Sequence, residues 1–135
     1  MFPFQLFKVD IKTGSLTKVK ELNVVSVNKT AAAEILLHPN REWVYVSSRG
    51  QGLVAVFSLS PDKEELAKVQ EFNIQGTWPR SMALSPTGDV LAVADQFSDS
   101  LQLLAVNPKD GTLSAKGHGV IKTPHQPSFV TFLRE

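Results

Sequence analysis

Charged residues capable of acid–base or anion chemistry stand at the ends of short apolar stretches of the sequence. Glu34 and Arg80 each open such a stretch, and Arg49 ends one. A carboxylate can take a proton from water, and a guanidinium can stabilise an oxyanion or hold a carboxylate or phosphate by its planar fork. Each residue also has a purely structural alternative, in which Glu34 pairs with Arg49 across a hairpin and Arg80 pairs with Asp95. The elements that position these side chains decide between the two.

Other residue types restrict the chemistry further. The sequence has no cysteine, which excludes disulfides, cysteine nucleophiles and thiolate metal sites. His38, His118 and His125 lie in turn-like segments without metal-ligand spacing. Gly50-Gln51-Gly52 lacks the third glycine and the strand-to-helix setting of a dinucleotide loop, so it indicates a hairpin turn. We therefore expect no metal and no cofactor.

Composition indicates an ordinary globular chain. The 135 residues are 42% hydrophobic, and 14 Lys and Arg face 13 Asp and Glu, a net charge of +1. This balance argues against nucleic acid or an anionic membrane as a partner. The longest apolar run, residues 90–94, is far short of the ~20 residues of a membrane span. The start of the sequence lacks a secretory signal pattern, and we expect a cytoplasmic location.

An internal repeat organises the chain. Residues 33–79 align on residues 80–126 at a spacing of 47, with apolar stretches on apolar stretches and turn prolines on turn prolines. Matched pairs are Ile35-Leu36-Leu37 with Met82-Ala83-Leu84, Pro39 with Pro86, Trp43-Val44-Tyr45-Val46 with Val90-Leu91-Ala92-Val93, and Pro61 with Pro108.

Each unit predicts four short strands separated by turn residues. The strands are expected at 34–38, 43–48, 53–59 and 66–74, and again at 81–85, 90–95, 100–106 and 113–121. Four-stranded antiparallel units at this spacing are typical of β-propeller blades around a central channel. We predict an all-β partial propeller of about two and a half blades plus one extra strand. It would be one domain over 1–135, with a half blade at 4–25, blades at 33–75 and 80–122, and the first strand of a further blade at 128–133.

One local signal favours a helix instead. Ser60-Pro61-Asp62-Lys63-Glu64-Glu65 has a capping serine, a proline at the first helical position and acids in the first turn. The matching segment of the second unit carries Gly111, Gly117 and Gly119, which are costly inside a helix. We therefore predict a strand here.

The hairpin geometry selects the residues at one rim of the channel. The first strand of a blade is innermost and antiparallel to the second, so the start of one lies beside the end of the other. This brings Glu34 near Arg49, and Arg80 near Asp95. We expect Trp43 and Trp78 to pack between blades. The alternative for Trp78, which leads into the same rim, is that it lines the channel and binds the substrate.

Several segments together resemble a known family. They are Ala33-Glu34-Ile35, His38-Pro39, Val44 to Gly50, Val54-Ala55-Val56-Phe57, Pro79-Arg80, Ser85-Pro86-Thr87-Gly88 and Leu91 to Gln96. They are similar to the C-terminal blades of the lactonase-type seven-bladed propellers, which include 6-phosphogluconolactonases of the cycloisomerase type and 3-carboxy-cis,cis-muconate lactonizing enzymes. The resemblance covers the last third or so of a family member.

The resemblance implies a metal-free site at the channel mouth. Glu34 and Arg80 would be catalytic, and Arg49 would bind the substrate, while a histidine and another arginine of the family site come from earlier blades. The implied activity is hydrolysis of a small anionic sugar lactone such as 6-phosphogluconolactone. The alternatives are a muconate-type lactonizing cycloisomerase and a non-catalytic interaction module. The expected partners are a small anionic lactone or carboxylate, and either missing blades or further copies of the chain that close the ring.

Overall fold

The computed structural model describes residues 3–24, 31–60, 62, 64–117 and 119–133. His118 and residue 25 of the expected half blade lie outside this range. The described residues form strands and turns, with no α-helix among them. The strands are β1 (Pro3–Val9), β2 (Leu16–Asn23), β3 (Ala31–Leu37), β4 (Trp43–Arg49), β5 (Leu53–Ser60), β6 (Glu65–Asn73), β7 (Pro79–Leu84), β8 (Val90–Asp95), β9 (Ser100–Val106), β10 (Leu113–Ser114) and β11 (Val120–Lys122).

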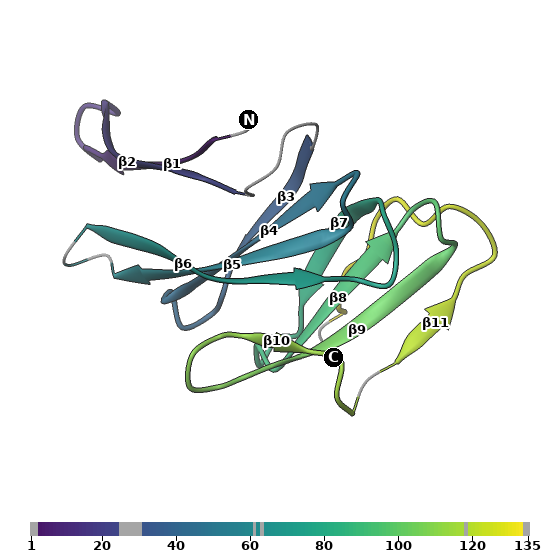
Figure 1. Ribbon diagram of the computed structural model, residues 1–135. Helices are drawn as coiled ribbons and strands as arrows, with labels where there is room; N and C mark the ends of the chain where they lie inside the picture. The colour runs from purple at the N-terminus through teal and green to yellow at the C-terminus, as the bar shows by residue number, and fades with distance from the viewer. Residues whose placement is uncertain (1–2, 25–30, 61, 63, 118, 134–135) are drawn as a thin grey trace.

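These strands build three antiparallel sheets (Figure 1). β1 pairs with β2, and β3, β4, β5 and β6 form a four-stranded sheet in chain order. The third sheet has five strands: β7, β8 and β9 pair in chain order, and β10 and β11 both pair with the far edge of β9. The two larger sheets follow each other along the chain, and their first strands β3 and β7 are in contact. This is the arrangement of successive propeller blades, so the all-β partial propeller prediction is confirmed.

The backbone itself repeats at the spacing found in the sequence. β3 has a register shift between Ala32 and Ile35, and β7 has one between Pro79 and Ser81, 47 residues further on. The β1–β2 and β5–β6 hairpins share a second irregularity, next to Phe7 in β1 and next to Phe57 in β5, at a spacing of 50 rather than 47 residues. A β-bulge inserts an extra residue and turns a side chain out of the regular alternation. In β7 that extra residue is Arg80.

The middle sheet is buried on both faces because neighbouring residues of β4 point in opposite directions. Trp43 and Tyr45 belong to a core shared with the third sheet, which includes Met82, Leu91, Val93 and Leu104. Val44 and Val46 belong to a second core, which Phe4, Leu6 and Leu22 of the β1–β2 hairpin cover. A strand covered on both sides reads as a continuous apolar run, which is why residues 43–46 lack polar alternation.

Residues 65–73 form a strand, β6, so the prediction of a strand over a helix is confirmed. β6 pairs with β5 along its whole length, from Leu53↔Asn73 to Ser60↔Glu65. Leu66 is buried in the core beneath the first sheet. The long-range pairing therefore outweighs the local capping signal around Ser60.

The expected single strand at 113–121 is wrong. β10 pairs with Val106 and Ala105, whereas β11 resumes opposite Gln102. Five residues on one side therefore face two on the other, and the excess leaves the ladder at Gly117, whose φ is +81°. Residue 118 lies outside the described residues.

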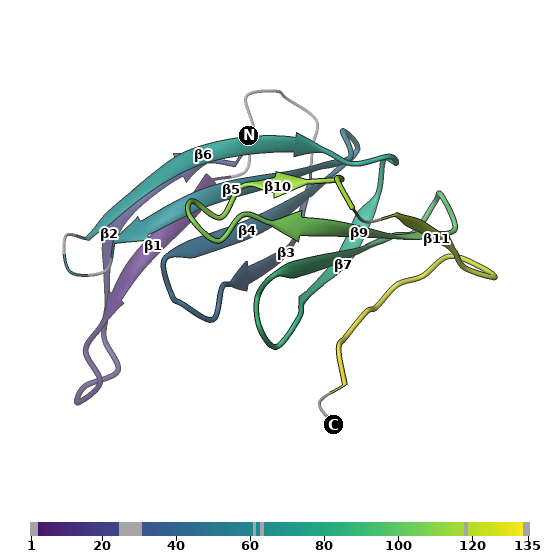
Figure 2. The ribbon, with the colours of Figure 1, turned by 90° about the horizontal axis from the view of Figure 1, so that it is seen from below.

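Residues 128–133, where we expected another first strand, are not in a strand in this structure. Figure 2 shows this C-terminal segment as an extended trace beyond β11. Its Val130 N donates to the Ser81 hydroxyl at 3.3 Å, a side-chain bond in place of a main-chain ladder. A strand needs a main-chain partner along its length, and here the segment lies against the first strand of the preceding sheet instead.

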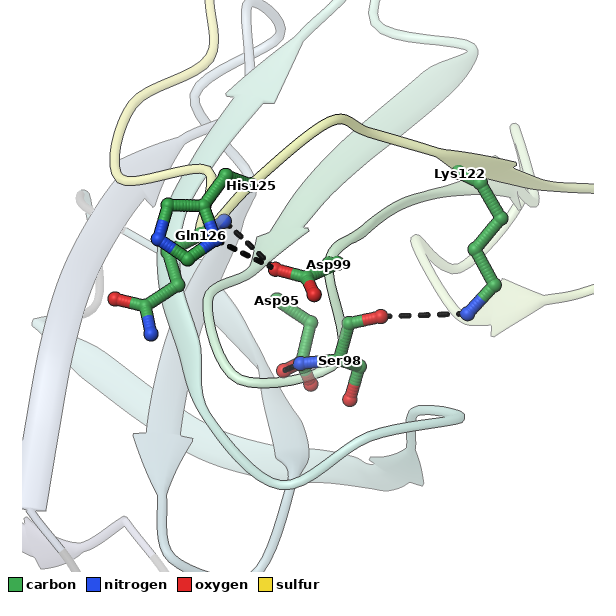
Figure 3. A network of polar contacts seen from close by, with 6 residues as sticks. All are labelled: Asp95, Ser98, Asp99, Lys122, His125 and Gln126. Atoms are coloured by element: carbon green, nitrogen blue, oxygen red, sulfur yellow. Dashed lines mark hydrogen bonds and ion pairs between the residues drawn. The ribbon is translucent and has the colours of Figure 1, made fainter.

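Polar contacts fix the start of this C-terminal segment to the β8–β9 turn (Figure 3). The Asp99 carboxylate accepts a bond from Gln126 N at 2.7 Å, and His125 Nδ1 lies 4.0 Å from the same oxygen. Lys122 Nζ donates to the Ser98 carbonyl at 3.3 Å. These contacts set the path that brings Ser128 and Phe129 to the rim.

No helix among the described residues has the length and apolar character to span a bilayer.

Candidate functional site

The bulged starts of β3 and β7 share one cavity of about 310 Å³. Glu34, Arg49 and Arg80 all contribute to its wall, so the structure brings together three of the four residues singled out in the sequence. Their neighbours in the wall are Ala33, Ser81, Ser128 and Phe129. A carboxylate and two guanidinium groups from two successive sheets therefore meet at one rim.

A larger hollow of about 470 Å³ continues from this cavity. It shares Glu34 and Phe129 with the first and follows β3 and β7 toward Pro39 and Pro86 at the far end of both strands. The hollow thus runs along the two innermost strands, as a propeller channel does.

Glu34 is half-buried and held by two hydrogen bonds. Its Oε2 accepts a bond from Met82 N on β7 at 2.7 Å, and its main-chain N donates to the Ser47 hydroxyl at 3.0 Å. The first bond joins the two sheets. Among the described residues Glu34 forms no ion pair, so the alternative pairing with Arg49 across the hairpin is wrong.

The Arg49 guanidinium lies over an aromatic ring. Its Cζ is 5.5 Å from the centre of the Trp78 ring, and its Nη2 donates to the Ala32 carbonyl at 3.4 Å. Its Nε is buried and has no hydrogen-bond partner among the described residues.

Arg80 is exposed and projects from the bulge of β7. The suggested pairing of Arg80 with Asp95 is not the arrangement found. Asp95 is 2% exposed. Its carboxylate accepts main-chain bonds from Trp78 N at 3.2 Å and from Ser98 N at 3.2 Å. Backbone donors satisfy hydrogen-bond acceptors of this carboxylate, and the Arg80 guanidinium stays available to the cavity.

Trp78 is not part of the wall of this cavity. Its ring lies between Arg49 and Phe97, with the Trp78 and Phe97 ring centres 5.0 Å apart. The structure therefore places Trp78 next to a cavity residue rather than in the cavity wall.

Two guanidinium groups against one carboxylate give the cavity an excess of positive charge, which suits an anionic ligand. Guanidinium groups bind phosphate or carboxylate through two parallel N–H bonds, and they stabilise an oxyanion in the same way. The Glu34 carboxylate uses one oxygen for Met82 N, and this bond fixes its orientation. The arrangement can therefore hold an anion and move a proton at a fixed point beside it.

Sequence reasoning missed Ser81, Ser128 and Phe129 as cavity residues and Phe97 as a neighbour of Trp78. The repeat contains the signal for Ser81, since it occupies the position equivalent to Glu34 at the spacing of 47. Both side chains accept a bond from the main chain of the next inner segment, Glu34 from Met82 N and Ser81 from Val130 N.

The successive antiparallel sheets of four and five strands, their adjacent first strands and the hollow between them define a segment of a β-propeller. Residues 3–132 match the family described as lactonase, 7-bladed beta-propeller, and the chain belongs to this family.

Relatives support the same family and share its architecture. The 6-phosphogluconolactonase of Bacillus subtilis is 27% identical over 122 residues, which are 86% of this chain and 34% of the relative. A Lactobacillus plantarum protein of known structure superposes with a TM-score of 0.89 at 28% identity, over 98% of this chain and 39% of that one. The periplasmic gluconolactonase of Pseudomonas aeruginosa has the same fold, with a TM-score of 0.84 at 24% identity, over 93% and 35%. The chain spans about a third of the length of the relatives it matches.

Proposed function

We propose that this chain supplies part of the active site of a lactonase that hydrolyses a small anionic sugar lactone, such as 6-phosphogluconolactone, without a metal. The observation that carries the proposal is the shared cavity of Glu34, Arg49 and Arg80. Membership of the lactonase family and the similarity to a 6-phosphogluconolactonase support the substrate class.

In this proposal Glu34 is the general base and Arg80 stabilises the oxyanion. Glu34 takes a proton from water as the water oxygen forms a bond to the lactone carbonyl carbon, and the C=O electron pair moves onto oxygen. Arg80 binds the resulting oxyanion. When the C=O bond reforms, the ring C–O bond breaks, and the leaving ring oxygen takes the proton back from Glu34. The products are the free hydroxyl and the carboxylic acid.

The magnitudes are those of ordinary acid–base and oxyanion catalysis. A positioned general base contributes about 10²- to 10⁴-fold to a rate. One oxyanion donor contributes about 10²- to 10³-fold. Arg49 adds charge for the phosphate or carboxylate of the substrate. The remaining groups of the site would come from further blades or from other copies of the chain, which together close the ring.

A cytoplasmic location stays a prediction. One similar structure is described as periplasmic, and that description belongs to the Pseudomonas aeruginosa protein.

The test measures hydrolysis of 6-phosphogluconolactone by Arg80→Ala and Arg80→Lys variants in the full-length context. We expect Arg80→Ala to lower kcat by about 10²-fold or more and Arg80→Lys to retain more of it, since lysine keeps the charge but loses the planar fork. Lys116→Ala, an exposed cation in the loop between β10 and β11, is the matched control. A chelator should leave the parent rate unchanged.

Three results would contradict the proposal: parent-like turnover by Arg80→Ala, loss of activity with a chelator, or no hydrolysis by the parent. In the last case, ring closure of a muconate-type acid by the parent would support the lactonizing alternative. Inactivity with both substrates would support a non-catalytic module.

A further inference from the structure

Three flat groups from two sheets stack beside the cavity. Arg49 comes from the end of β4, Trp78 from the connection between β6 and β7, and Phe97 from the β8–β9 turn. The Arg49 guanidinium lies over the Trp78 ring at 5.5 Å, and the Trp78 and Phe97 rings are 5.0 Å apart with their planes 33° apart. The stack therefore spans the junction between the second and third sheets.

The backbone of Trp78 is fixed from the side of the third sheet. Trp78 N donates to the buried Asp95 carboxylate at 3.2 Å, and Gln96 N donates to the Trp78 carbonyl at 3.1 Å. A side chain on Gly76 would overlap the Asp95 carboxylate, so this connection lies directly on the carboxylate. Gly50 N of the second sheet donates to the carbonyl of the preceding residue, Thr77, at 2.8 Å. Hydrogen bonds to both sheets therefore hold the backbone that carries the indole.

The Arg49 guanidinium, in contrast, has few hydrogen bonds of its own. Its bond to the Ala32 carbonyl is long, at 3.4 Å, and its buried Nε has no partner among the described residues. The contact with the indole ring therefore contributes much of what holds the group in place. A cation–π contact with a ring uses none of the guanidinium's N–H donors as hydrogen bonds, so the donors without another partner can bind an anion.

We propose that Trp78, backed by Phe97, is a positioning residue that holds Arg49 for a phosphate or carboxylate group in the cavity. Trp78 itself does not touch that group. This role differs from direct binding of the substrate by Trp78, since the indole acts only through the arginine. The anionic nature of the ligand rests on the proposed function, but the positioning can be tested without turnover.

The test is an NMR titration of the protein with inorganic phosphate, followed at the Arg49 Nε–H signal. Because this N–H is buried, its exchange with solvent is slow enough to observe, and the ring below it shifts its resonance. We expect phosphate to bind saturably and to move the Arg49 signal. In Trp78→Leu the signal should lose its ring-current shift and exchange faster, and phosphate should bind about three- to tenfold more weakly.

Trp78→Phe keeps a ring and should restore most of the affinity. Phe7→Leu, an exposed aromatic on β1 away from the cavity, is the control and should leave phosphate binding unchanged. If Trp78→Leu does not fold, Phe97→Leu takes its place, with an expected loss of about twofold or more from a looser stack.

Two outcomes overturn the proposal. One is an Arg49 signal in the parent that does not respond to phosphate. The other is phosphate affinity in Trp78→Leu, or in its replacement Phe97→Leu, equal to that of the parent. A parent that binds phosphate at Arg49 but hydrolyses no lactone would refute the proposed function and leave the positioning role intact.

Discussion

Replacing Glu34 by alanine should destabilise the protein, because the Glu34 carboxylate joins two sheets. Its Oε2 accepts a 2.7 Å bond from Met82 N, and Met82 is 2% exposed. Alanine would leave that main-chain donor without its acceptor at a site where water has little access. Glu34→Gln keeps an acceptor oxygen of the same reach and should conserve most of the stability.

The expected loss of unfolding free energy follows from the type of hydrogen bond that Glu34→Ala removes. A hydrogen bond to a charged group contributes about 1.5–3 kcal/mol, and an orphaned buried donor costs a similar amount. Because Glu34 is only half-buried, the lower part of this range applies, about 2 kcal/mol for Glu34→Ala. For a domain of this length that loss lowers Tm by roughly 6–10 °C. Ser81→Ala removes the equivalent but longer bond to Val130 N, and should cost less than about 1 kcal/mol.

The assay is urea unfolding followed by tryptophan fluorescence, to which Trp43, in the core between the second and third sheets, and Trp78 contribute. All variants should show the same dependence of unfolding free energy on urea, so that the midpoints compare directly. A Glu34→Ala variant within 0.5 kcal/mol of the parent, or a Glu34→Gln variant as unstable as Glu34→Ala, would refute this account of the bond, given a typical uncertainty of about 10–15% in such free energies.

Three further predictions concern stability alone. Gly88→Ala should lower Tm markedly, because Gly88 has a φ of +80° and a methyl there would overlap the His38 ring; calorimetry measures this, and a parent-like Tm would contradict it. Burial, with a smaller effect from the negative charge of Asp110, raises the pKa of Tyr45 in the folded protein. The free energy of unfolding should therefore be unaffected by this group below pH 10 and fall by up to about 1.4 kcal/mol per pH unit above it. Tyr45 is the one tyrosine of the sequence, so its phenolate absorbance should appear together with unfolding rather than before it. The Thr112 hydroxyl and then the Thr112 main-chain N–H lower the pKa of Asp110 below 3.8. Thr112→Val removes the hydroxyl, so it should lower the free energy of unfolding above that pH and reduce how much of it is lost on acidification. Unfolding midpoints measured from pH 6 to 2 check this.

The strands and their order could be predicted because each hairpin is local. Apolar stretches of four to seven residues between turn residues define β4, β5, β8 and β9, and the observed bounds agree within one or two residues. The segment 113–121 could not be predicted in detail, because its departure from the ladder depends on the register that β9 offers. Residues 128–133 are not in a strand in this structure, since a strand exists only where a main-chain partner lies beside it, and their place as the first strand of a further blade stays a prediction.

The sequence could predict the positions of those site residues that antiparallel pairing within a sheet determines. Pairing places the start of a first strand beside the end of the second, which brings Glu34 and Arg49 to the same rim, and the repeat does the same for Arg80. The bond from Met82 N to Glu34 could not be foreseen, because it crosses between sheets and depends on the bulges. The placement of Trp78 against Arg49 and Phe97 also arises only when the two sheets meet.

The most direct measurement of the central claim is the kcat of Glu34→Gln for 6-phosphogluconolactone, made in the full-length context. The amide retains an acceptor for Met82 N but cannot take a proton from water. We predict a kcat at least about 100-fold below that of the parent, with an unfolding midpoint close to the parent value. A kcat near the parent value would show that the carboxylate serves only to join the two sheets, and that the cavity of Glu34, Arg49 and Arg80 is not where the lactone is opened.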